Sequence, residues 1–222
     1  QPIIMGVLNI TPDSFSDGGL FFDSKSAITQ AEVMVQEGAG IIDIGGESTR
    51  PGAPEVSIED ELNRVIPVIE ALSSNIDIPI SIDTSKPIVM EKAFNAGASI
   101  INDVNALRSE GALQMAASLQ ADVCLMHMQG SPRTMQKNPT YDNVVSDVKA
   151  FFEQRIEACK SAGIKLNAIT LDPGFGFGKN LGHNIALLKN LSEFHEFGVS
   201  ILAGLSRKSM IGSLLGDKDV DS

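Results

Sequence analysis

Seven short apolar runs recur along the chain, and each one stops at a polar residue or a polar loop. They are rich in Ile, Val and Leu and mostly do not alternate with polar residues, a pattern typical of strands buried on both faces of a parallel sheet. The predicted strands are Ile3–Leu8, Ile41–Ile44, Ile78–Ile82, Ser99–Ile101, Asp122–Met126, Ala168–Leu171 and Val199–Ala203.

Helical signals lie between these runs. Apolar residues from Ala27 to Val35 keep helical spacing, and Gly38 suits a helix end. Ser57 and Asp60 resemble the start of a capping box, while Pro67 predicts a kink in the helix that follows. Further helices are predicted from Pro87 to Gly97 and over Leu113–Leu119, Val144–Ala162 and Asn184–Leu191.

Seven strand–helix units predict an α/β fold, a (β/α)8 TIM barrel. Closing the ring with right-handed parallel connections requires an eighth strand. We therefore expect the eighth strand and the final helices outside these residues, so that residues 1–222 are a single barrel domain, incomplete at its C-terminal end. An open doubly wound sheet is the alternative.

The composition of the chain limits the classes of binding partner. The net charge of −11 argues against nucleic acid and against anionic membrane surfaces. An anionic substrate would need local Lys or Arg side chains, a helix N-terminus or a metal ion. The chain has two cysteines, Cys124 and Cys159, which argues against a disulfide framework and predicts a reducing, cytoplasmic setting.

Polar residues follow the predicted strands, where a parallel barrel builds its active site. Any one of them alone is as readily explained as a helix cap or a turn residue, but seven together indicate a site. In chain order they are Asn9, Asp43, Asp83, Asn102 with Asp103, His127, Asp172, and Ser206 to Lys208.

Carboxylates and amides in such a ring suit a flat ligand that carries several N–H donors. A 2-amino-4-oxo pyrimidine, as in guanine or a pterin, presents an N–H and an NH2 side by side, and one carboxylate accepts both. Chelation of Mg²⁺ by Asp83, Asp103 and Asp172 is the competing interpretation, although their spacing matches no recognised metal motif.

Two loops, one helix start and one glycine-rich stretch add further candidate binding groups. The loop Asn9–Gly19 predicts a mobile lid, with a plain solvated loop as its alternative. The loop Gly45–Gly52 and the helix start Ser206–Ser209 combine hydroxyls, backbone N–H groups and cations that suit phosphate. In Asp172–Lys179, three glycines alternate with two phenylalanines, so the backbone can turn and approach a ligand. His127 is predicted at the edge of the core.

Seven motifs in the same order resemble the dihydropteroate synthase family of folate biosynthesis, the target of sulfonamides. They are NITPDSFSDGG from Asn9, DIGGESTRPGA from Asp43, SIDTSKP from Ser81, INDV from Ile101, LMHMQGSP from Leu125, LDPGFGFGKN from Leu171 and LSRKSMIG from Leu205. The resemblance implies a pterin-binding barrel that condenses 6-hydroxymethyl-7,8-dihydropterin pyrophosphate with p-aminobenzoate, giving 7,8-dihydropteroate and pyrophosphate with Mg²⁺ as cofactor.

The resemblance also implies roles for individual residues. Those implied to hold the pterin are Asp83, Asn102, Met126, Asp172 and Lys208. Thr49 and Arg50 are implied to contact the pyrophosphate or to order the lid, and Asn9 is implied at the Mg²⁺–pyrophosphate. Those implied around p-aminobenzoate are Pro51, Phe177 and Ser209. The catalytic group would be Asp83, Asp172, Lys208 and Arg50.

One family feature does not occur in these residues: the Arg-x-His pair of the last strand, which completes the anion site. The family's closing helices form a dimer contact, so we expect a homodimer in the full-length protein. A pterin-binding methyltransferase domain and an inactive paralogous binding subunit are the alternative functions.

Overall fold

The computed structural model describes residues 2–10, 20–48, 53–130, 135, 139–206 and 212. The chain divides into two compact units. The first comprises residues 1–48 and 54–123, and the second comprises residues 49–53 and 124–222. Strand β5 (Asp122–Met126) begins in the first unit and ends in the second.

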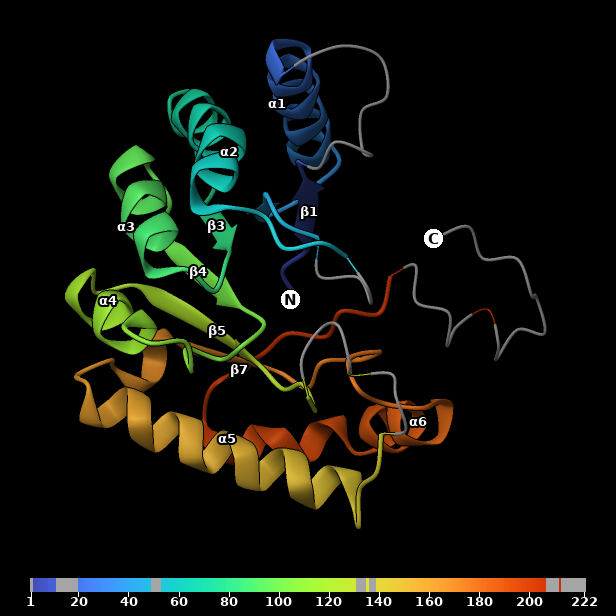
Figure 1. Cartoon of the computed structure of the whole chain (residues 1–222). Helices are drawn as coiled ribbons and strands as arrows, with labels where there is room; N and C mark the ends of the chain where they lie inside the picture. Colours follow the sequence, from blue (N-terminus) through green and yellow to red (C-terminus); the bar gives the residue numbers. More distant parts are fainter. Residues whose placement is uncertain are drawn as a thin grey trace. The chain divides into compact units, whose positions relative to one another are not determined.

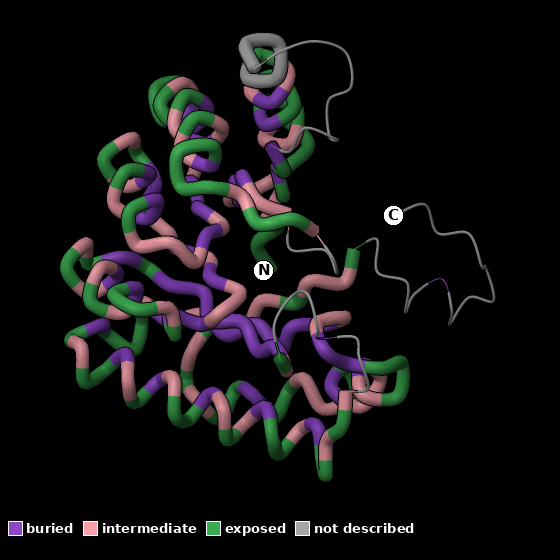
Figure 2. The backbone as a smooth tube through the Cα atoms, viewed as in Figure 1, coloured by how far each residue is buried: buried purple, intermediate pink, exposed green. Residues whose placement is uncertain are grey.

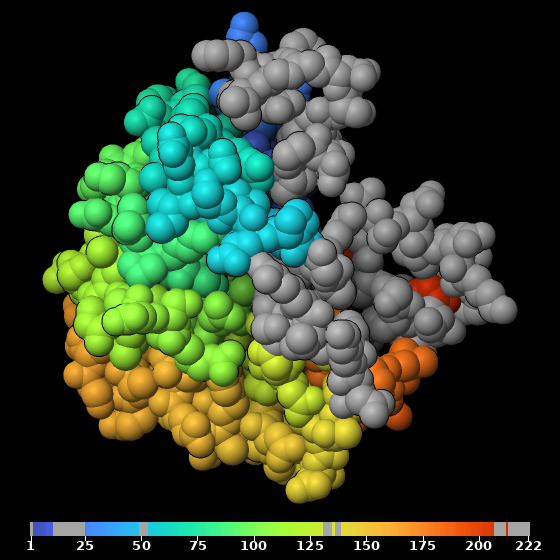
Figure 3. Space-filling model, viewed as in Figure 1, coloured from blue at the N-terminus to red at the C-terminus, as the bar shows by residue number. Residues whose placement is uncertain are grey.

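The first unit is a run of parallel strands with a helix after each. Its strands are β1 (Met5–Asn9), β2 (Ile41–Gly45), β3 (Ile80–Asp83) and β4 (Ile100–Asp103), paired in that order. Its helices are α1 (Leu20–Gln36), α2 (Ile58–Ser73), α3 (Pro87–Ala96) and α4 (Ala112–Ser118). Helices α1, α2 and α3 stand side by side along the strands (Figure 1), and α2 and α3 form adjoining parts of the surface (Figure 3).

Local chemistry explains where these helices begin and end. The Ser57 hydroxyl accepts a hydrogen bond from the Asp60 backbone N–H at 3.0 Å, which caps α2 as predicted. The helix continues past Pro67 to Ser73, so this proline does not end it. Helix α3 has Pro87 in its first turn and ends at Gly97, where φ is +121°. A methyl group on Gly97 would lie 2.4 Å from the Ser73 Cβ, so glycine also permits the close approach of α2.

Strands and helices also alternate in the second unit. It holds the end of β5, β6 (Ile169–Asp172), β7 (Ser200–Ile201), α5 (Val144–Ser161) and α6 (Leu181–Lys189), with short 3-10 helices at Leu166–Ala168 and Leu191–Phe197. Strands β6 and β7 pair in parallel. Phe152 of α5 is fully buried and meets the Phe194 ring edge-on, with centroids 5.8 Å apart.

All seven predicted strands are present, with ends that shift by up to two residues. Ile42, Ile44 and Ile82 are fully buried, as the apolar runs predicted. Strands β2, β3, β5 and β6 are largely buried, whereas β1 and β7 are mostly half-buried or exposed (Figure 2). The first strand begins at Met5, two residues later than predicted, and Ile3 and Ile4 lie exposed before it. None of the helices in the described residues is long and apolar enough to cross a membrane.

Candidate functional site

Four residues of the first unit form one row across the ends of its strands. Asn9 is in register with Gly45, Gly45 with Asp83, and Asp83 with Asn102. Residues in register on parallel strands direct their side chains to the same face. A methyl group on Gly45 would lie 3.5 Å from both Asn9 Oδ1 and Asp83 Oδ2. The glycine therefore leaves open the space between an amide and a carboxyl.

Asp43 supports this row from two residues earlier in β2. It is buried, and its Oδ2 accepts a hydrogen bond from the Asn102 amide at 3.0 Å, which fixes the orientation of that amide. Burial raises the pKa of Asp43, and the nearby Ser81 hydroxyl and Asn102 amide only partly oppose the rise. The geometry of Ser81 falls short of a hydrogen bond, so Asp43 Oδ1 and Ser81 Oγ have no partner among the described residues.

The pKa of the Asp83 carboxyl group is strongly perturbed by its surroundings. Burial raises its pKa well above the ordinary value, and repulsion from Asp43, Asp103, Glu61 and Glu47 raises it further. Within the described ranges, no group donates a hydrogen bond to its carboxylate. An ionised Asp83 carboxylate would therefore have no compensating donor among the described residues, as expected of a group that binds a ligand with N–H donors.

Asp103 has a structural role instead. Its Oδ1 accepts from the Ser85 hydroxyl and from the Asn105 N–H at 2.8 Å, and its Oδ2 accepts from the Leu107 N–H at 2.8 Å. These bonds order a tight loop in which Leu107 has a φ of +57°. In the part of the chain that the structure describes, no group of three His, Cys, Asp or Glu side chains could hold a metal ion, so chelation by Asp83, Asp103 and Asp172 gains no support.

Lys86 forms ion pairs with two carboxylates. Its role was not predicted from the sequence. Its Nζ lies 2.5 Å from Glu47 Oε2 and 2.5 Å from Glu61 Oε2, and Glu61 is fully buried. Burial alone would lower the pKa of Lys86, but hydrogen bonds and attraction to both carboxylates outweigh it and raise the pKa. Glu47 belongs to the Gly45–Gly52 loop, so this network anchors the start of that loop.

Replacing Lys86 with methionine should destabilise the first unit. The change leaves Glu61 buried with only the Thr84 hydroxyl, 2.6 Å from its Oε1, as a partner. Breaking a buried ion pair on one side costs roughly 3–5 kcal/mol. Urea unfolding measures the loss, and the double variant Lys86→Met/Glu61→Gln should recover much of it. Equal stability of wild type and single variant would contradict this account.

The second unit brings Met126, Asp172 and Phe177 into one neighbourhood. Asp172 ends β6, and its Oδ1 accepts from the Gly174 N–H at 2.8 Å, which orients the buried carboxyl. The Asp172 backbone oxygen accepts from the His127 N–H at 2.9 Å. Met126 ends β5, and its Cγ would lie 3.3 Å from a methyl group on Gly174. The half-buried Phe177 follows one turn later, its N–H bonded to the Gly174 oxygen at 3.0 Å.

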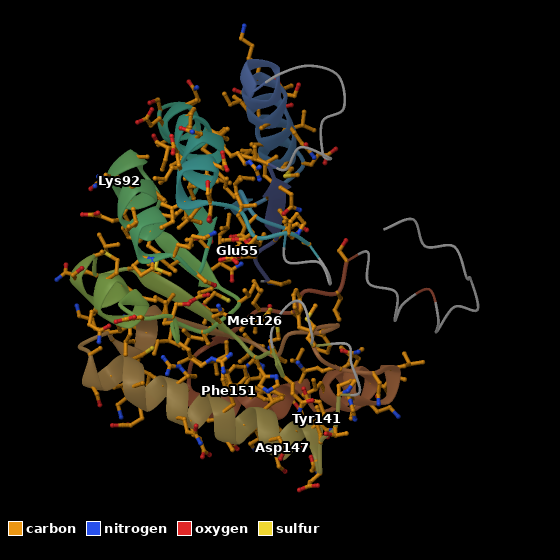
Figure 4. The ribbon with its side chains drawn as sticks, in the orientation of Figure 1. Glu55, Lys92, Met126, Tyr141, Asp147 and Phe151 are labelled. Carbon is orange, nitrogen blue, oxygen red and sulfur yellow. The ribbon has the colours of Figure 1, made fainter. Side chains whose placement is uncertain are left out.

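The stretch from Gly174 to Lys179 is held by residues that the sequence analysis missed. Tyr141 donates to the Gly178 oxygen at 2.7 Å, and burial, with repulsion from Asp147, raises the Tyr141 pKa to about 12. Asn184 accepts from the Gly176 N–H at 2.9 Å. His127 is buried, as predicted for a core-edge residue, and its ring meets Phe151 edge-on with centroids 5.0 Å apart. Tyr141, Phe151 and Met126 appear in Figure 4.

Several predicted residues lie outside the described part of the chain, and their roles stay predictions. They are Thr49, Arg50, Pro51, Lys208, Ser209 and the lid residues 11–19. Of the predicted site residues that are described, the first unit gathers Asn9, Asp83 and Asn102, and the second gathers Met126, Asp172 and Phe177.

Comparison with known proteins gives consistent matches along the whole chain. The model of the family described as pterin binding enzyme matches residues 5–222. The dihydropteroate synthase of Haemophilus influenzae is 58% identical over 220 residues, which cover 99% of this chain and 80% of that protein.

Solved structures agree. The Yersinia pestis dihydropteroate synthase in a sulfonamide drug complex has a TM-score of 0.91 and 54% identity, over 97% of this chain and 78% of that one. The Xanthomonas albilineans enzyme with 4-aminobenzoic acid has a TM-score of 0.93 and 49% identity, and the same enzyme with 7,8-dihydropteroate has 0.89 and 46%. Both of these matches cover 100% of this chain and 79% of theirs.

A parallel strand–helix repeat with amides and carboxyls at the strand ends defines a barrel enzyme of the pterin-binding class, and the fold class predicted from the sequence is confirmed. Within that class, the chain belongs to the dihydropteroate synthase family. It is accordingly an enzyme, a transferase.

Proposed function

We propose that the protein condenses 6-hydroxymethyl-7,8-dihydropterin pyrophosphate with p-aminobenzoate, giving 7,8-dihydropteroate and pyrophosphate for folate biosynthesis. The observation that carries this proposal is the uncompensated carboxyl of Asp83, in register with the oriented amide of Asn102. A pterin ring offers such a pair adjacent N–H donors. Complexes of the Xanthomonas albilineans relative with 4-aminobenzoic acid and with 7,8-dihydropteroate support the choice of substrates.

In this proposal, Asp83, Asn102 and Asp172 bind the pterin ring, Met126 lines its pocket, and Phe177 borders the site for p-aminobenzoate. When the C–O bond to pyrophosphate breaks, positive charge spreads over the pterin. The carboxylates of Asp83 and Asp172 stabilise that charge electrostatically. The weakly nucleophilic aniline nitrogen then attacks the exocyclic carbon and releases one N–H proton to solvent, and no covalent link to the enzyme is needed.

The remaining proposed roles fall on residues outside the described ranges. Lys208 bonds to the pterin, Thr49 and Arg50 contact the pyrophosphate, and Pro51 and Ser209 frame the p-aminobenzoate site. A guanidinium suits a pyrophosphate because its planar fork bonds two oxygens at once.

The residues present fit a Mg²⁺ ion that is shared with the substrate. Mg²⁺ commonly takes one or two protein oxygens and completes its shell with water and phosphate oxygens. Asn9 is exposed at the end of β1, and its Oδ1 faces the open space above Gly45. We propose Asn9 as the protein ligand; when bound, Mg²⁺ would neutralise the pyrophosphate leaving group.

A two-product assay tests the function. Full-length protein is mixed with dihydropterin pyrophosphate, p-aminobenzoate and Mg²⁺, and pyrophosphate and dihydropteroate are measured. We expect the two products in a 1:1 ratio, and no dihydropteroate when p-aminobenzoate is omitted. Absence of product above background would refute the synthase, whereas methyl transfer from a methylated tetrahydropterin would favour the methyltransferase alternative.

We also propose a homodimer of the full-length protein in a reducing cytoplasm. Both cysteines are buried, and burial raises the pKa of the Cys159 thiol to about 11, so that thiol is not poised to form a disulfide. Light scattering of the full-length protein tests the dimer, since a monomer mass would contradict it.

A further inference from the structure

We infer that Lys179 is a positioning residue whose buried ammonium group holds the Asp172–Lys179 loop in shape for substrate binding. The inference rests on the proposed function for the identity of the substrates. Lys179 is 3% exposed, although lysine is among the residues least often buried. Its Nζ has at least four close partners: His127 Nδ1 at 3.0 Å, the His127 oxygen at 3.1 Å, the Gly174 oxygen at 2.9 Å and the Phe177 oxygen at 2.9 Å.

These four contacts define the chemistry of the position. An ammonium group has three N–H donors and no acceptor, so His127 Nδ1 must accept and its ring proton must lie on Nε2. The three other partners are backbone carbonyls, the same type of ligand that proteins use to hold monovalent cations. The three carbonyl oxygens and His127 Nδ1 therefore form a cation-binding site, and the Lys179 ammonium group fills it.

Each carbonyl belongs either to a residue that is hydrogen-bonded to Asp172 or to Phe177 itself. The His127 N–H bonds the backbone oxygen of Asp172, and the Gly174 N–H bonds the Asp172 carboxylate. The third carbonyl is that of Phe177 itself. The ammonium group thus ties together the segment after β5, the turn that orients Asp172 and the ring proposed to border p-aminobenzoate.

Other bonds hold the same loop without touching the ammonium group. Tyr141 bonds the Gly178 oxygen, and Asn184 bonds the Gly176 N–H. A loop that lost the lysine would keep these outer bonds but would leave three carbonyls facing one another. We therefore expect altered positions of Asp172 and Phe177 in a protein that still folds.

The first experiment compares Lys179→Met with wild type and with the exposed-surface control Lys189→Met, using full-length protein. We expect Lys179→Met to raise KM for p-aminobenzoate at least tenfold and to lower kcat about a hundredfold, while Lys189→Met stays within twofold. A folded Lys179→Met variant with wild-type kinetics overturns the inference. If wild type itself forms no dihydropteroate, the proposed function fails instead.

The second experiment asks whether the site takes a free cation. In Lys179→Ala, ethylammonium chloride should restore activity about tenfold, whereas tetramethylammonium, which has no N–H donor, should not. Equal effects of the two salts would overturn the cation role. If the methionine and alanine variants do not fold, Lys179→Arg decides: its charge is kept, but a planar fork cannot converge on four acceptors, so KM for p-aminobenzoate should rise at least fivefold. A folded arginine variant with unchanged KM refutes the inference.

Discussion

Replacing Asp83 with asparagine should stabilise the folded protein at neutral pH and at the same time weaken pterin binding by roughly 30- to 1,000-fold. The stabilisation follows because four carboxyl groups repel the Asp83 charge, and none of the described groups bonds to it. The loss of binding follows because an amide accepts through one oxygen only and turns an NH2 group toward the ligand's donors. Charge-assisted hydrogen bonds of this kind contribute about 2–4 kcal/mol together.

The sign of the pH dependence is fixed by the raised pKa of Asp83. The folded state holds its proton to higher pH than the unfolded state does, so wild type loses stability as pH rises through the folded pKa. The asparagine variant lacks this loss. The difference in unfolding free energy, variant minus wild type, should therefore grow with rising pH and vanish in acid. Urea unfolding at several pH values measures it, and calorimetric titration with a pterin measures binding.

Asp103→Asn is the matched control, because it removes a second buried carboxylate of the same unit. The Asp103 oxygens accept from the Asn105 and Leu107 N–H groups, and an amide would leave one of these donors unsatisfied. We expect this variant to be less stable than wild type by about 1–3 kcal/mol. Stabilisation by both substitutions would mean that net charge alone is responsible, and destabilisation by Asp83→Asn would contradict the electrostatic account.

The sequence was enough to predict that Asp83 and Asn102 are neighbours, because buried parallel strands have a simple pattern of short apolar runs. Short apolar runs fix where strands end, and parallel strands bring their carboxyl ends to one edge, so polar stops become neighbours. The register of Asn9, Gly45, Asp83 and Asn102 confirms that reasoning. The order of the motifs also identified the family.

The sequence did not distinguish a carboxyl group that has no donor among the described residues from one whose oxygens already accept hydrogen bonds. Asp83 and Asp103 both end a strand, yet only the geometry shows that the Asp103 carboxylate already accepts hydrogen bonds from the loop that follows it. Lys86 and Lys179 escaped notice for a related reason. Lysine usually lies on the surface, and partners such as Glu61 or the His127 carbonyl are 25 and 52 residues away in the chain. Only folding brings such groups together.

Gly174→Ala should be the most disruptive of the substitutions in the second unit. A methyl group there would lie 2.0 Å from the His127 oxygen, a carbonyl that also receives the Lys179 ammonium group. The φ of +69° adds strain for any residue with a Cβ. Overpacking and the left-handed backbone together cost roughly 2–5 kcal/mol. Urea unfolding should show a lower midpoint with an unchanged slope.

The variant Gly198→Ala separates the cost of backbone strain from the cost of overpacking. Gly198 has a nearly identical φ of +67°, but a methyl group on it would meet nothing within 4 Å. This variant therefore carries the backbone strain alone, about 1 kcal/mol. The excess loss in Gly174→Ala measures how tightly the loop packs on the His127 carbonyl, and that excess should appear again as weaker p-aminobenzoate binding, because the same carbonyl helps to place Phe177. Equal losses in the two glycine variants would mean that the loop can move away from His127, and the packing that orients Asp172 would then be looser than these distances imply.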